Sequence, residues 1–77
     1  MRILITEDDR GIRRAILEIL ELEGHQVDEA ADGQEALAKC EETTFDVLFC
    51  DIKMPKMDGL ELMQSLKALD HQPEIIV

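Results

Sequence analysis

Short apolar runs alternate along the chain with longer stretches in which apolar residues recur every three or four positions. The run at 2–6 and the run at 47–51 are apolar at nearly consecutive positions, which is typical of parallel strands covered on both faces. The run at 25–31 is weaker, with Val27 as its one strong core residue, and 74–77 begins a fourth strand. The run at 47–51 ends on Asp51, where removing a charge from water costs free energy unless the charge has a partner or a function.

The stretches between these runs have the period and the terminal signals of helices. For 10–23, Asp9 is a suitable N-cap and Gly24 occupies the position where a glycine ends a helix. Apolar residues that recur there near helical spacing are Ile12, Ala15, Ile16, Ile19, Leu20 and Leu22. A capping-box pattern, Asp32 with Glu35, opens a second helix that runs to about residue 42.

The second helix is expected to turn Ala36, Leu37 and Cys40 inward. Asp58 and Glu61 repeat the capping-box pattern before a third helix. That helix carries Leu60, Met63 and Leu66 and ends before 70–73. Strands and helices therefore alternate from end to end, with connections short enough for right-handed parallel crossovers. The pattern predicts one α/β domain over 1–77.

Composition limits the function classes. A chain of 77 residues holds one small domain, and 18 acidic against 8 basic residues give a net charge of −10. Nucleic-acid binding by this segment is not expected, because phosphate contacts need clustered Lys and Arg. No signal peptide and no apolar run of the roughly 20 residues that span a membrane is visible. Cys40 and Cys50 lie in apolar surroundings, as core thiols of a cytoplasmic protein do.

Three carboxylates are expected to meet at one edge of the sheet. Glu7 and Asp8 follow the first strand and Asp51 ends the third, and ligands of open parallel sheets gather at the carboxyl ends of strands. Two charges about 4 Å apart repel by roughly 4 kcal/mol at an effective dielectric near 20, so the group needs a cation. Oxygen ligands alone favour Mg²⁺. Helix capping is the alternative for Asp8 and Asp9, but it leaves Asp51 unexplained.

Three segments carry a resemblance to a known family: "ILITEDDRGIRRAI", "ADGQEAL" and "DVLFCDIKMPKMDGLEL". Together they resemble the receiver domain of bacterial two-component response regulators. The resemblance implies a flavodoxin-like (CheY-like) parallel sheet with strand order 2-1-3-4 over 1–77. By the same resemblance the chain is a partial receiver, lacking the fifth strand and the last two helices of the family.

The resemblance also assigns roles. Asp51 corresponds to the phosphoacceptor, Glu7 and Asp8 to the acidic pair that binds Mg²⁺ with Asp51, and the backbone carbonyl of Lys53 to a further metal ligand. The implied partner is a sensor histidine kinase, which would dock on Ile12 and Ala15; burial of Ile12 in the core is an equal alternative. The domain would be a signalling module rather than an enzyme.

Two alternatives stay open beside this hypothesis. The family's Thr or Ser after the fourth strand and its Lys after the fifth are not among these residues, so phosphorylation could fail to switch the domain. The chain could then serve only as a structural or oligomerising module, through the open edge of 74–77 or by exchange of elements between chains. An aspartate-nucleophile phosphohydrolase is disfavoured, because such enzymes carry a second Asp where this chain has Lys53.

Overall fold

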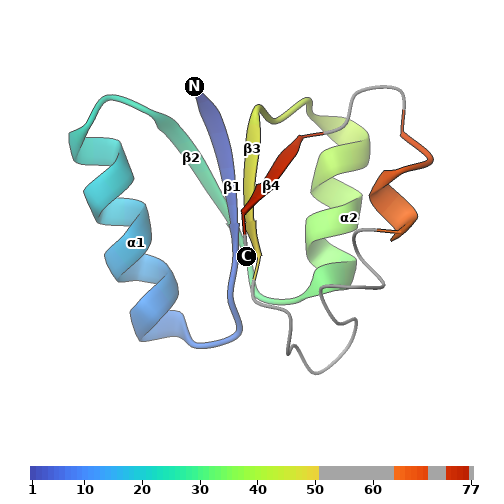
Figure 1. The fold of residues 1–77 in the computed structure, drawn as a ribbon. Coiled ribbons are helices and arrows are strands. Elements are labelled where there is room, and N and C mark those ends of the chain that lie inside the picture. Colours follow the sequence, from blue (N-terminus) through green and yellow to red (C-terminus); the bar gives the residue numbers. More distant parts are fainter. Residues whose placement is uncertain (51–63, 70–72, 77) are drawn as a thin grey trace.

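The computed structural model describes residues 1–50, 64–69 and 73–76, and these form a parallel sheet with a helix on each face. The elements are β1 (Arg2–Thr6), α1 (Arg10–Leu22), β2 (Gln26–Ala30), α2 (Gly33–Glu42), β3 (Val47–Cys50) and β4 (Glu74–Ile76). The strand order is β2-β1-β3-β4 with every pair parallel, which confirms the expected topology (Figure 1). The helix expected after Asp58 falls largely outside the described residues; Gln64 to Leu66 are helical.

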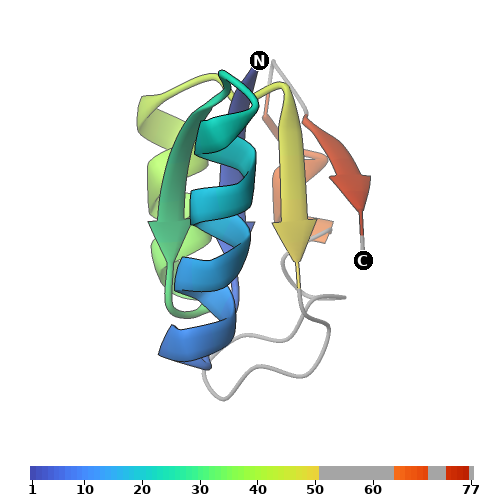
Figure 2. The ribbon, with the colours of Figure 1, turned by 90° about the vertical axis from the view of Figure 1, so that its left-hand side faces the viewer.

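The two faces of the sheet hold separate parts of the core. α1 lies on one side of the strands and α2 on the other (Figures 1 and 2). On the α2 side, Leu4 and Leu48 are fully buried and pack with a cluster that includes Phe45 and Leu66. On the α1 side, the buried cluster is Ile3, Ile5, Leu17 and Val47. The alternation along β1 explains why its run is apolar at consecutive positions.

The helix ends follow the predicted signals. Asp9 caps α1, since its Oδ1 accepts a hydrogen bond of 3.0 Å from the backbone N–H of Ile12. Gly24 has φ +90°, a conformation that residues with a Cβ rarely adopt, and it ends α1. Asp32 caps α2 through the N–H of Glu35, at 2.9 Å. The Glu35 carboxylate in turn accepts from the N–H of Ala31, one residue before the cap.

The sheet covers only part of the apolar surface of α1. Leu17 is buried with Ile16 and Leu20 against the sheet. Ile12, Ile19 and Leu22 are exposed by 52%, 59% and 88%. The helix carries apolar residues on two stripes, and the sequence period alone does not say which of them meets the sheet. Ile12 lies on the exposed stripe, so the alternative that it is buried in the core is wrong.

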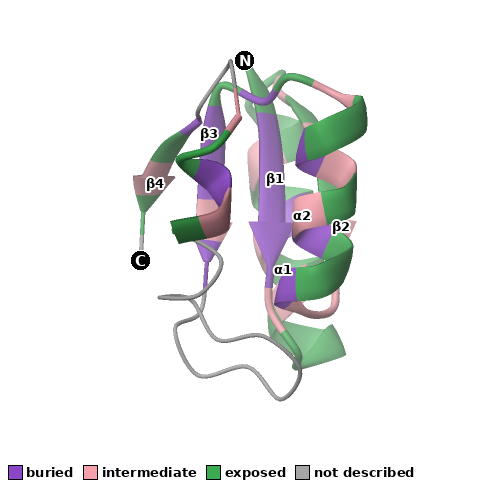
Figure 3. Cartoon of the chain, turned by 90° about the vertical axis from the view of Figure 1, so that its right-hand side faces the viewer, coloured by how far each residue is buried: buried purple, intermediate pink, exposed green. Residues whose placement is uncertain are grey.

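The core contribution of β2 was also placed on the wrong residue. Ala30 is fully buried in the cluster under α2, whereas Val27 is only partly buried on the α1 side. β2 is an outer strand of the sheet, and only its last residue, Ala30, is buried. The central strand β1, by contrast, is buried along most of its length (Figure 3). The small side chain of Ala30 lets α2 pack closely on β2 at this point.

Cys40 and Cys50 are both buried thiols, as expected. Burial raises the pKa of the Cys40 thiol to about 11, which keeps it protonated and unreactive at neutral pH. Among the described residues, no helix combines the length and apolar character needed to cross a membrane.

Candidate functional site

The acidic residues after β1 lie at the carboxyl edge of the sheet. Glu7 and Asp8 follow Thr6, the last residue of β1; Glu7 is half-buried and Asp8 is exposed. Thr6 pairs in register with Cys50, the last residue of the neighbouring β3. Asp51 is the next residue in the sequence, and both Asp51 and Lys53 lie outside the described residues.

Hydrogen bonds fix the segment that presents these acids. The N–H of Glu7 donates to the carbonyl of Ala30 at 3.1 Å, which continues the pairing of β1 with β2. The Glu7 Oε1 atom accepts from the N–H of Asp9 at 3.2 Å. Asp9, not Asp8, caps α1. The capping explanation therefore holds for Asp9 and leaves Asp8 with no capping role.

Arg13 supplies a further bond that the sequence pattern did not reveal. Its guanidinium donates from Nη1 to the carbonyl oxygen of Glu7 at 2.9 Å and from Nε to Glu29 Oε1 at 2.8 Å. Arg14 donates to the other oxygen of Glu29 at 2.6 Å. The hydrogen bond from Arg13 holds the pKa of the Glu29 carboxyl below its ordinary value, with Arg14 adding to the effect against an opposing contribution from burial.

The described acidic residues of the candidate site offer ligand atoms that suit a hard cation. Within residues 1–50, 64–69 and 73–76, no three Asp, Glu, His or Cys side chains come close enough together to hold a metal ion. Two of the predicted donors, Glu7 and Asp8, adjoin each other at the strand end and offer carboxylate oxygens, which Mg²⁺ prefers. The chemistry of these two residues fits the predicted ion, and the third carboxylate belongs to Asp51.

The predicted docking residues lie on the outer stripe of α1. Ile12 and Ala15 are exposed, and Ile19 and Leu22 continue the same stripe toward the end of the helix. Ile12 is therefore not a core residue. Its position one turn into α1 places it near the acidic residues after β1.

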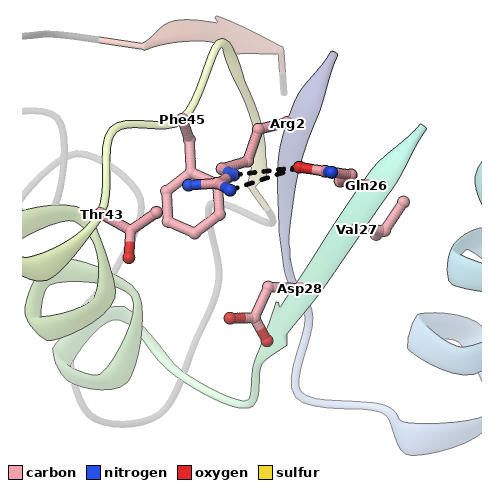
Figure 4. A pocket seen from close by; sticks show the side chains of 6 residues that line it. All are labelled: Arg2, Gln26, Val27, Asp28, Thr43 and Phe45. Atoms are coloured by element: carbon pink, nitrogen blue, oxygen red, sulfur yellow. Dashed lines mark hydrogen bonds between the residues drawn. The ribbon is translucent and has the colours of Figure 1, made fainter.

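A separate hollow of about 300 Å³ lies near the amino end of β1, away from Glu7 and Asp8 (Figure 4). Its lining residues are Arg2, Gln26, Val27, Asp28, Thr43 and Phe45. Its charged groups already have partners: Arg2 donates to Gln26 Oε1 at 3.3 Å, and Lys39 pairs with Asp28 at 2.9 Å. We assign no role to it in the acidic site.

Fold and site together define a doubly wound α/β domain with acidic residues at the carboxyl edge of a parallel sheet. The response regulator receiver domain model matches residues 3–77. The chain belongs to this receiver domain family. This confirms the resemblance noted in the sequence.

Relatives and solved structures agree with this assignment. The chain is 38% identical to the response regulator MprA of Mycobacterium avium over 77 residues, all of this chain and 34% of that protein. It is 36% identical to sporulation initiation phosphotransferase F of Bacillus subtilis, covering 99% of this chain and 61% of that one. The response regulator TrrA of Thermotoga maritima, solved in complex with Mg²⁺–BeF, superposes with a TM-score of 0.90 at 36% identity, covering 99% of this chain and 66% of that one. The chain thus spans about a third to two thirds of the length of these proteins.

Proposed function

We propose that the chain accepts a phosphoryl group on Asp51 from a sensor histidine kinase, with Mg²⁺ held by Glu7, Asp8, Asp51 and the backbone carbonyl of Lys53. The observation that carries the proposal is the register of β1 with β3, in which Thr6 pairs with Cys50. The acidic pair and the acceptor each follow the carboxyl end of one of these neighbouring strands. Parallel sheets gather ligands at that edge.

The chemistry proposed for Asp51 is a direct transfer. A carboxylate oxygen of Asp51 bonds to phosphorus while the bond from phosphorus to the histidine nitrogen of the donor breaks, and an acyl phosphate forms. Bound Mg²⁺ supplies charge neutralisation for the transferred phosphoryl group. Glu7 and Asp8 contribute oxygen ligands, and the folded sheet contributes the position of all the acids.

The names and bound groups of several similar proteins support this proposal. Sporulation initiation phosphotransferase F is a phosphotransferase, TrrA was solved with Mg²⁺–BeF, and a receiver domain of the hybrid histidine kinase CckA superposes with a TM-score of 0.90. The transcriptional regulatory protein ResD of Bacillus subtilis is 36% identical over 99% of this chain. A phosphotransferase, a complex with Mg²⁺–BeF and a receiver domain of a histidine kinase are consistent with phosphoryl transfer to this chain. A cytoplasmic location and the absence of nucleic-acid binding by this segment stay predictions.

The test is chemical labelling of the protein with a small acyl-phosphate donor. We expect a Mg²⁺-dependent gain of one phosphoryl group that hydroxylamine removes and that maps to the peptide containing Asp51. A label that forms equally well in EDTA, or that maps to another peptide, would contradict the assignment.

Docking of the kinase is proposed on the exposed stripe of α1, at Ile12 and Ala15. Replacing Ile12 with Asp should slow transfer from a cognate kinase by about tenfold or more, because a charge would be buried in an apolar contact. Labelling by the small donor should persist, since Ile12 is 52% exposed and supports no core. Equal loss with both donors would indicate that the substitution disturbs the fold instead.

Self-association is proposed through β4. In the described sheet β4 is an outer strand that pairs with β3, and Ile76 is 41% exposed. An exposed strand edge is a template for another chain. Light scattering of these 77 residues at micromolar concentration should give more than one chain per particle, and Ile76→Lys should lower that number. Ile19→Lys, which alters an apolar residue exposed by 59% on α1, is the matched control. A monodisperse monomer would refute the proposal.

A further inference from the structure

Arg13 occupies a position on α1 where the helical period of apolar residues predicts an apolar side chain. It precedes Ile16, Leu17 and Leu20 at spacings of three, four and seven, and those residues pack on the sheet. Its side chain is only 12% exposed. A buried cation needs hydrogen-bond acceptors. Two nitrogen atoms of Arg13 have them, one in Glu7 after β1 and one in Glu29 on β2.

The two partners of Arg13 are adjacent to the candidate metal site. One is the main-chain carbonyl of Glu7, at 2.9 Å; the other is the Glu29 carboxylate on β2, at 2.8 Å. Glu29 directly precedes Ala30, whose own carbonyl accepts the N–H of Glu7. The peptide groups on both sides of Glu7 are therefore fixed, one by β2 itself and the other by a guanidinium that β2 orients.

We infer that Arg13 is a positioning residue for the Mg²⁺ site, held in place by Glu29. The inference rests on the proposed function of the same site. A guanidinium bond to the Glu7 carbonyl limits rotation of the segment that carries Glu7 and Asp8, so their carboxylates need less ordering when the ion binds. Without Arg13 the same ligands remain, but they must be ordered by the ion itself.

Arg14 provides a matched control in the same helix. It bonds the same carboxylate as Arg13, but its side chain is 51% exposed, and the bond to the Glu7 carbonyl comes from Arg13. If Mg²⁺ affinity depended only on positive charge near Glu29, substituting either arginine would lower it. If it depends on the hydrogen bond to the Glu7 carbonyl, only the substitution of Arg13 should lower it.

The experiment measures the half-saturating Mg²⁺ concentration in two ways: from the amide chemical shifts of residues 7–9 without any phosphoryl donor, and from the rate of labelling by a small acyl phosphate. The proteins compared are the unsubstituted protein, Arg13→Gln, Glu29→Gln and Arg14→Gln. For Arg13→Gln we expect the half-saturating Mg²⁺ concentration to rise about tenfold, the loss of one charge-assisted hydrogen bond, with the rate at saturating Mg²⁺ retained. Glu29→Gln should give a smaller rise in the same direction. Arg14→Gln should stay within about twofold, as an exposed ion pair does.

The Arg13→Gln, Glu29→Gln double variant should be no worse than Arg13→Gln alone, because both changes remove one interaction. Arg13→Lys keeps the charge and can still donate one hydrogen bond, so it should recover part of the Mg²⁺ affinity. It also replaces Arg13→Gln in the experiment if that variant fails to fold. A protein that takes no label at any Mg²⁺ concentration would overturn the proposed function. Labelling with unchanged Mg²⁺ dependence in Arg13→Gln, or a lowered maximal rate alone, would overturn this inference while leaving the function standing.

Discussion

Replacing Asp51 with Asn is expected to abolish the hydroxylamine-sensitive phosphoryl label completely. An amide oxygen is a poor nucleophile and carries no charge, so it forms no acyl phosphate. The change is nearly isosteric, and the core of β3 is built by Val47, Leu48 and Cys50, which it leaves intact. Far-UV circular dichroism of Asp51→Asn should therefore match that of the unsubstituted protein, and mass spectrometry should find no added phosphoryl group.

Asp46→Asn is the matched control for this experiment. Asp46 precedes β3 at its amino end, where its Oδ2 atom accepts a hydrogen bond of 2.8 Å from the N–H of Arg2. It is an exposed carboxylate beside the same strand, at the edge of the sheet opposite to Glu7 and Asp8. We expect Asp46→Asn to label at the normal rate. A label that persists in Asp51→Asn, or is lost in Asp46→Asn, would assign the acceptor to another residue.

Much of the fold follows from local signals in the sequence. The continuous apolar runs locate β1 and β3 because each strand contributes to both faces of the core. Asp9, Gly24 and Asp32 mark helix ends because each satisfies a backbone requirement within a few residues. Strand order is a different matter. It depends on which strands pair at long range, and it was available only through the family resemblance.

Which apolar residues are buried in α1 and β2 depends on the neighbouring elements, because these decide which side chains are covered. α1 carries more apolar residues than one face can bury, and the sheet covers Leu17 rather than Ile12 or Ile19. Val27 looked like the core residue of β2, but the close approach of α2 buries Ala30 instead. Hydrophobicity along the chain does not contain this information.

The candidate site, like the fold, could be predicted from the sequence only in part. The place of Glu7 and Asp8 at the carboxyl edge of the sheet could be predicted, because they directly follow the apolar run of β1. Their role as Mg²⁺ ligands stays a prediction. The contribution of Arg13 and Glu29 could not be predicted, since it depends on α1 packing against β2. One signal was present: Arg13 holds a place in the helical period where an apolar residue would bury itself. A cation at an inward position predicts a partner, although not which one.

A second large effect is expected at Leu48, in the middle of β3. Leu48 is fully buried and packs in the cluster between the sheet and α2, beside Leu4 in the register of β1 with β3. Leu48→Ala should lower the free energy of unfolding by about 2–5 kcal/mol, because it removes apolar contacts and leaves a cavity. A domain of this size has a total stability of roughly 4–12 kcal/mol. The substitution should therefore remove a large part of it, as measured by urea unfolding.

Leu22→Ala makes the same chemical change where the structure predicts almost no cost. Leu22 is the last residue of α1 and is 88% exposed, so little apolar surface returns to water when its side chain is shortened. Its effect should stay within about 0.5 kcal/mol, as for other surface substitutions. The difference between the two variants reports mainly on burial, because the deleted atoms are identical and the differences in helix and strand propensity are smaller. Equal destabilisation would mean that Leu22 is covered in solution, by another chain or by residues beyond those the structure describes, and the outer stripe of α1 would then be an occupied interface.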